Sequence, residues 1–195
     1  MFRTKLVVLT AALAVALMVP GAAQAQQQSL SFNVGYFWVN GESGRVDGDT
    51  IVANLGGGDF ALDYKVEDFN NATFGAEWLV RMGKFLEVGV GAGYYAKSVP
   101  SFYAVLTHDD GRDITQDLRL RVVPVTVTAR YFPLSHRAAV QPYIGAGVGV
   151  AIYRYSETGE FVDGDYNVFR ANYVATGTAT GPVILGGVRL PVNHN

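Results

Sequence analysis

The stretch PYIGAGVGVAIYRY, at positions 142–155, alternates between two kinds of side chain. Every second residue from Ile144 to Ile152 is aliphatic, whereas the residues between them are mainly glycines and end in tyrosines. The stretch KFLEVGVGAGYYAK, at positions 84–97, repeats this pattern closely. Successive side chains of a β-strand point to opposite faces, so both stretches predict strands with one aliphatic and one glycine-rich face.

Four more segments alternate in the same way. They span residues 30–39, 72–82, 118–131 and 182–190, and their apolar faces include Phe32, Val34, Trp78, Val80, Val123, Val125, Val127, Ile184 and Val188. The sequence therefore predicts six antiparallel strands, each about as long as the 9–11 residues of a tilted membrane crossing. The predicted fold class is all-β, an up-and-down transmembrane β-barrel.

The composition of the two faces indicates which of them points outward. A soluble β-sandwich turns its apolar face inward, which here would leave a face of glycines in water. Small inward side chains instead fit the narrow interior of a small barrel. The aliphatic face is then expected to meet lipid. The aromatic residues expected in the interfacial girdles are Tyr36, Trp38, Trp78, Tyr94 and Tyr131.

The predicted connections alternate in length. Those at 81–84 and 132–141 are short, whereas those at 41–68, 98–116 and 156–180 are long, polar and rich in Gly and Asp. Outer-membrane barrels have short periplasmic turns and long external loops. The first strand is therefore expected to run outward, with both termini on the periplasmic side.

The N-terminal 25 residues have the three parts of a secretory signal peptide. Arg3 and Lys5 precede an apolar run from Leu6 to Val19, and Ala23-Gln24-Ala25 forms a small-x-small cleavage site. We expect residues 1–25 to be removed after export by the Sec pathway, leaving a barrel domain at 26–195. Removal of two basic residues leaves 13 Lys and Arg against 17 Asp and Glu, a net charge of 13 − 17 = −4. That charge argues against a nucleic-acid partner.

Four charged residues are expected to point into the barrel near its periplasmic end: Glu77, Glu87, Arg130 and Arg189. Lone charges are expensive to bury, so two acids and two bases at one depth are expected to pair. We interpret them as a lumen charge network that fills the barrel. The alternative is a gated ion path through the same residues.

Other arrangements carry weaker signals. His108-Asp109-Asp110, with Ser101 nearby in the sequence, suggests an outer-membrane lipid hydrolase, but closeness in a loop does not establish the mutual contact that a catalytic triad requires. The Asp-Gly repeats at 47–49, 109–111 and 163–165 do not complete a calcium loop and are ordinary turn formers. The chain has no cysteine, and its three histidines lack metal-ligand spacing. No cofactor, metal site or enzymatic activity is predicted. A soluble secreted barrel that binds a small apolar ligand remains an alternative.

The run from Tyr131-Phe132-Pro133-Leu134 through PYIGAGVG at 142–149, taken with the signal peptide and the glycine-rich strands, resembles the outer-membrane β-barrel domain family. These are small OmpA/OmpW/OmpX-like barrels of eight strands, and the resemblance covers roughly residues 26–190. It implies the architecture and an outer-membrane location, and no shared catalytic residues come with it. The implied partners are outer-membrane lipid, lipopolysaccharide and the barrel-assembly machinery.

The chain departs from that family in its strand count. Six strands are readable where eight are expected, and Asn195 is not the terminal aromatic residue of such barrels. We expect two further strands beyond Asn195. The alternative is that residues 168–178 add a strand. The expected role is structural, surface-interacting or porin-like, meaning passage of a small solute.

Overall fold

The computed structural model describes residues 27–39 and 62–191, which are mostly β-strand. In chain order the elements are β1 (Gln28–Phe37), β2 (Leu62–Asp63), the short 3-10 helix η2 (Val66–Phe69), β3 (Asn71–Met82), β4 (Leu86–Thr107), β5 (Asp113–Tyr131), β6 (Gln141–Val162) and β7 (Val168–Arg189). The predicted signal peptide and most of the predicted 41–68 link lie outside the described residues. No helix in the described ranges is long and apolar enough to cross a membrane.

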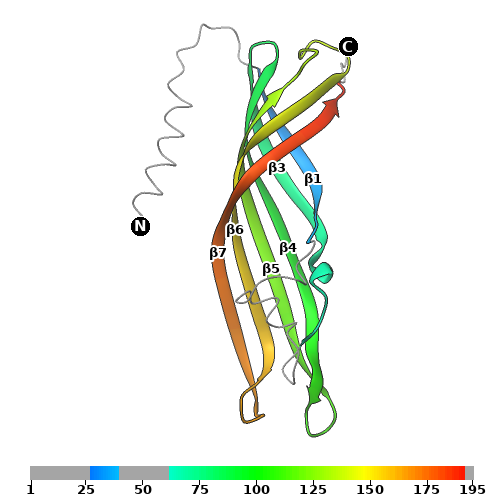
Figure 1. The fold of residues 1–195 in the computed structure, drawn as a ribbon, viewed down its shortest axis with the longest axis vertical. Helices are drawn as coiled ribbons and strands as arrows, with labels where there is room; N and C mark the ends of the chain where they lie inside the picture. Colours follow the sequence, from blue (N-terminus) through cyan, green and yellow to red (C-terminus); the bar gives the residue numbers. More distant parts are fainter. Residues whose placement is uncertain (1–26, 40–61, 192–195) are drawn as a thin grey trace, which may run out of the picture.

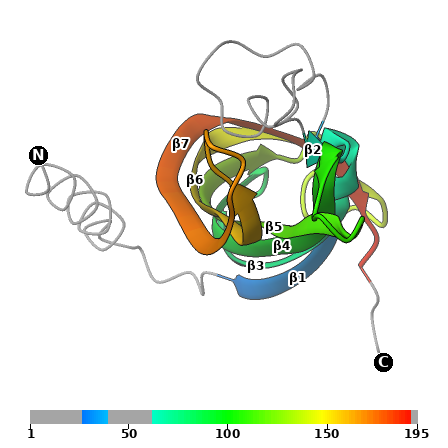
Figure 2. The same cartoon turned by 90° about the horizontal axis from the view of Figure 1, so that it is seen from below.

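The strands form one antiparallel sheet in the order β1-β3-β4-β5-β6-β7, and β2 pairs with β4 beside this path. In Figure 1 the β3–β4 and β5–β6 connections lie at the upper end of the sheet, and the β4–β5 and β6–β7 hairpins lie at its lower end. Figure 2 shows the sheet curling round on itself. The prediction of an all-β, antiparallel, up-and-down fold is confirmed. The sheet is not closed, since β1 and β7 are not paired with each other in the described part of the chain.

Two of the predicted long links are wrong. The link predicted at 98–116 is only 108–112, because β4 continues to Thr107 and β5 begins at Asp113. The link predicted at 156–180 is only 163–167. Residues 168–178 are the first half of β7 rather than an additional strand, and they continue without a break into the strand predicted at 182–190.

The strands β4 to β7 extend further than predicted. The prediction stopped short because the two faces of each strand exchange polarity partway down. In the upper part of β5, Val125 and Val127 point outward. Lower down, Leu118 is buried inside whereas Arg119 and Arg121 are exposed. The two-residue period continues, but the apolar residues change from one face to the other. A prediction based on aliphatic outward faces therefore makes β4, β5, β6 and β7 too short.

The upper part of the sheet carries a continuous apolar surface on its outside, which we call the apolar band. Its cross-strand rows join neighbouring strands, as where Val127 lies opposite both Val90 and Val148. Its exposed members include Leu30, Phe32, Val34, Phe74, Trp78, Val90, Tyr94, Val125, Val127, Ile144, Val148, Ile152, Ile184 and Val188. Trp78 belongs to the band and lies opposite Leu30 and Val90.

The lower part of the sheet encloses an ordinary hydrophobic core. Its buried members are Leu62, Tyr64, Phe69, Val99, Tyr103, Ile114, Leu118 and Tyr155. The segment that contains β2 and η2 contributes the first three, and the Tyr95 hydroxyl donates a hydrogen bond to the Phe69 carbonyl. This end of the sheet therefore buries apolar side chains inside, whereas charged side chains such as Arg119 and Arg121 are exposed.

The glycines of the inner face leave space for large neighbours. A Cβ on Gly187 would lie 2.8 Å from the Tyr143 hydroxyl oxygen, and a Cβ on Gly89 would lie 2.5 Å from a Glu77 carboxylate oxygen. Tyrosine rings and a carboxylate thus occupy the volume that larger inward residues would fill. The close approach accounts for glycine at these two positions.

Candidate functional site

The inner side of the upper end holds a cluster of Glu77, Glu87, Arg130 and Arg189, which we call the inner charge cluster. These residues come from β3, β4, β5 and β7, respectively. Glu87 lies directly opposite Arg130 in the β4–β5 register. Arg189 reaches Glu87 from β7, which is not adjacent to β4 in the sheet. The structure thus brings together all four charged residues singled out in the sequence.

The cluster is a connected set of charge-assisted hydrogen bonds. The two terminal nitrogens of Arg189 donate to the two carboxylate oxygens of Glu87 at 3.0 and 2.8 Å. Arg130 Nη1 lies 3.5 Å from Glu87 Oε1, and Arg130 Nη2 donates to Glu77. Arg130 therefore bridges the two acids, and Glu87 bridges the two arginines.

Burial makes this pairing necessary. Glu87 is 1% exposed, and Glu77 and Arg130 are 8% and 9% exposed. Charges in such surroundings have lost most of their hydration, and only close partners offset that cost. Arg189 is the most accessible member, with its side chain 27% exposed.

Two aromatic rings pack against the guanidinium groups. The Arg130 guanidinium lies 5.3 Å from the centre of the Tyr143 ring, and that of Arg189 lies 5.0 Å from the centre of the Phe132 ring. The Phe132 and Tyr143 rings are themselves 5.4 Å apart. Cation–π contacts of this kind add to the ion pairs, so the cluster is packed as well as paired.

Sequence reasoning missed two contributors. Thr128 donates a hydrogen bond of 2.8 Å to Glu77 Oε1, and Arg81 Nε lies 4.0 Å from Glu87 Oε2. Thr128 shares a face with Arg130, two residues away, so strand periodicity could have identified it. Arg81 was assigned to a connection, although it lies opposite Glu87 in the β3–β4 hairpin.

A short connection covers the same end of the sheet. His136 donates through Nδ1 to the Lys84 carbonyl oxygen at 2.8 Å, which joins the β5–β6 connection to the β3–β4 turn. The His136 ring also packs on Phe132, with 4.3 Å between ring centres. Burial and the nearby Arg81 charge lower the pKa of His136, which favours the neutral imidazole.

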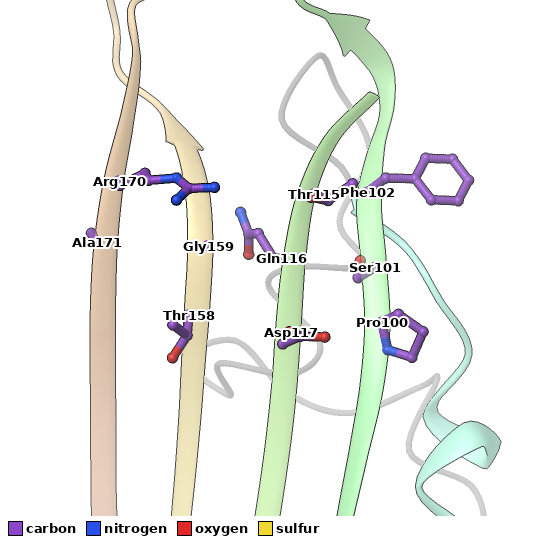
Figure 3. Close-up of a pocket in the computed structure, with 10 residues that line it drawn as sticks. All are labelled: Pro100, Ser101, Phe102, Thr115, Gln116, Asp117, Thr158, Gly159, Arg170 and Ala171. Atoms are coloured by element: carbon purple, nitrogen blue, oxygen red, sulfur yellow. The ribbon is translucent and has the colours of Figure 1, made fainter. Parts of the chain in front are cut away.

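The candidate hydrolase residues are not brought together. The Ser101 hydroxyl is buried and faces the Asp63 carbonyl oxygen at 3.5 Å, whereas His108 Nε2 contacts Glu160 Oε2 at 3.0 Å in the lower hairpin. His108 lies seven positions after Ser101, just beyond the end of β4 at Thr107, which is roughly 20 Å along the chain at the usual rise of a strand. Figure 3 shows Ser101 on β4, next to the part of β5 that carries Gln116. The arrangement lacks the contact that nucleophile and base require.

The aspartate at the start of the lower β6–β7 hairpin forms a turn. The Asp163 carboxylate accepts backbone hydrogen bonds from Asp165 at 2.9 Å and from Asn167 at 2.8 Å. The bond from Asn167 is the largest cause of the lowered pKa of Asp163. Across residues 27–39 and 62–191, no three metal-binding side chains gather in one place. The predicted Asp47-Gly48-Asp49 turn lies outside the described residues.

Comparison of the chain with protein-family models, curated proteins and solved structures found no match. The apolar band and the inner charge cluster are therefore the features of this chain that bear on its function.

Proposed function

We propose that this chain is a membrane-embedded outer-membrane β-barrel protein whose interior is filled by the inner charge cluster, and that its role is structural or surface-interacting. The observation that carries the proposal is the apolar band. Phe32, Val148 and Ile184 are 78%, 67% and 84% exposed, and they belong to a surface that extends over six strands. Apolar surface on this scale marks contact with a membrane or a large partner.

The dimensions of the band support lipid as that partner. The outward apolar residues of β6 run from Ile144 to Ile152, about nine residues, close to the length of a tilted membrane strand. Below them the outward residues turn polar and the apolar residues turn inward. This change matches a sheet that leaves the hydrocarbon and continues into water.

The inner charge cluster favours a filled interior over an open passage. The buried Glu77, Glu87 and Arg130 and the partly exposed Arg189, which come from four strands, are linked to one another on the inner side of the upper end. Passage of a small solute or ion would require these contacts to open. The proposal also requires the outer edges of β1 and β7 to be paired in the membrane, because unpaired backbone groups are not tolerated in hydrocarbon.

Membrane extraction tests this proposal. The protein, expressed with its export signal, is expected to stay in the membrane pellet after alkaline carbonate and urea washes. Unheated samples are expected to migrate differently from boiled ones in SDS gels, because paired barrels resist detergent unfolding. Recovery in the soluble fraction, with no effect of heating on migration, would reject the membrane proposal.

A further inference from the structure

The outer surface just below the apolar band carries three arginines, Arg119 and Arg121 on β5 and Arg154 on β6, which we call the arginine patch. All three are exposed. They border a shallow depression together with Ser98, Asp117, Ser156, Thr158 and Asn172. Figure 3 shows two of these residues, Asp117 and Thr158, on the adjacent strands β5 and β6. The patch lies on the outer face of the sheet, whereas the inner charge cluster lies on the inner face.

The arginine patch places like charges next to each other. Arg121 lies directly opposite Arg154 in the β5–β6 register, and Arg119 lies opposite Ser98 and Ser156. Like charges directly across a strand pair destabilise the sheet. Among the described residues, Asp117 is the only acid that borders the depression. Three positive charges therefore meet one negative charge.

These arginines differ from most others in the described part of the chain. Arg112 pairs with Asp110, Arg170 with Glu160, and Arg130 and Arg189 with the buried glutamates. Within the described residues, Arg119, Arg121 and Arg154 have no ion pair with any acid. An anion from outside the chain would relieve the repulsion between Arg121 and Arg154.

The position of the patch identifies the kind of anion. Arg121 and Arg154 lie one cross-strand row below Val123 and Ile152, which face each other at the lower edge of the apolar band. A lipid lying with its acyl chains along the apolar band would place its headgroup at this level. Arginine binds phosphate bidentately, and the side chains of Ser98, Ser156 and Asn172 supply further hydrogen-bond donors.

From these observations we propose that the arginine patch binds the phosphorylated headgroup of an anionic lipid at the membrane surface. The inference rests on the proposed membrane location, because only an embedded protein presents the patch at headgroup depth. The occupant is a lipid phosphate rather than free phosphate, since the apolar band continues directly from the patch and would hold the acyl chains.

Native mass spectrometry and thermal unfolding in zwitterionic micelles test the proposal, with diphosphorylated lipid A as the probe. The wild-type chain is expected to retain bound lipid A and to unfold at a higher temperature when it is present. The triple variant Arg119→Gln, Arg121→Gln, Arg154→Gln is expected to lose at least tenfold in affinity. The matched control Arg137→Gln, an exposed arginine in the β5–β6 connection, is expected to bind as the wild type does.

Two further arms identify the source of the anion. Dephosphorylated lipid A is expected to lose the same tenfold, and inorganic phosphate at millimolar concentration is expected to compete weakly. Equal protection by inorganic phosphate and by lipid A would show an adventitious ion only and overturn the proposal. The triple Arg→Lys variant keeps the charge without the bidentate geometry, so it is expected to bind lipid A with intermediate affinity.

The failure of this inference can be separated from failure of the proposed function. If the triple Arg→Gln variant still resists carbonate extraction but binds lipid A as tightly as the wild type, the patch is not a lipid site, while the membrane proposal stands. If the wild type is recovered in the soluble fraction, both proposals fail. In phosphate-free micelles, the triple Arg→Gln variant is expected to unfold at no lower temperature than the wild type, because a repulsive pair has been removed.

Discussion

Glu87 on β4 receives two hydrogen bonds from Arg189 on β7, at 3.0 and 2.8 Å, across 102 positions of the sequence and across the inside of the curled sheet. The bonds cross from one strand to another that is not its neighbour, so they do not follow from the backbone ladder. They join the last strand of the sheet to the middle of it. Removing one partner is the most direct test of what the inner charge cluster contributes.

We predict that Glu87→Gln lowers the free energy of unfolding by about 3 kcal/mol, because it leaves Arg130 and Arg189 without their shared partner inside the sheet. The estimate is at the low end for a buried pair, since Arg189 is partly exposed. Urea unfolding in micelles, followed by tryptophan fluorescence, measures the change. Glu67→Gln, at an exposed position in η2, is the control and should change stability by less than about 0.5 kcal/mol.

Conductance in a planar bilayer tests whether the cluster fills the interior. The wild-type chain is expected to show little current, and Glu77→Ala is expected to increase it, because the substitution removes the partner of Arg130 and the acceptor of the Thr128 hydroxyl. The same variant should also be less stable. If Glu77→Ala leaves both conductance and stability unchanged, neither the filled interior nor the gated path survives.

A charge placed in the apolar band separates a membrane protein from a soluble one. Val148 is 67% exposed, so Val148→Arg would be almost neutral in a water-soluble sheet. In a lipid-facing strand it should destabilise the folded state by about 2–4 kcal/mol. The control is Thr115→Arg, at an exposed outward position in the polar lower part of β5. Equal stability of the two variants in lipid vesicles would contradict the proposed lipid contact.

Sequence periodicity located the upper part of each long strand and the residues of the inner charge cluster. It did not locate the lower ends, for a physical reason visible in β5. Leu118 and Leu120 occupy even positions and point inward, whereas Val123 and Val125 occupy odd positions and point outward. In a single sequence, a shift of the apolar residues from even to odd positions looks like the end of a strand. In this sheet the apolar residues change from the inner to the outer face, and the strand itself continues.

The sequence predicted that the four inner charges pair, but it did not predict which residues of non-neighbouring strands contact each other. The pattern places Glu87 and Arg189 on the inner face at one depth, but only the curvature of the sheet brings β4 and β7 within hydrogen-bonding distance. The same curvature brings Phe132 over Arg189. Pairing within a hairpin, as between Arg81 and Glu87, follows from register alone and could have been predicted.

A pair of glycines on β7 tests the packing of the inner face. A Cβ on Gly187 would lie 2.8 Å from the Tyr143 hydroxyl and 2.9 Å from its ring carbon, whereas a Cβ on Gly181 meets nothing within 4 Å. We predict that Gly187→Ala costs about 1–3 kcal/mol, because the Tyr143 ring must move. Gly181→Ala should be neutral or slightly stabilising. Equal effects in urea unfolding would show that Tyr143 does not pack on Gly187.

Acid should weaken the upper end of the sheet through His136. Burial and the Arg81 charge lower the pKa of this imidazole in the folded protein, so the unfolded chain binds the proton more readily. The contribution of His136 to stability is therefore fully present above the unfolded pKa of about 6.5. It is lost as the pH falls through the lower folded value. Melting temperatures measured in micelles between pH 7.5 and pH 5 are expected to fall for the wild type and to fall less for His136→Gln. Equal slopes for the two proteins would assign the acid sensitivity to other groups.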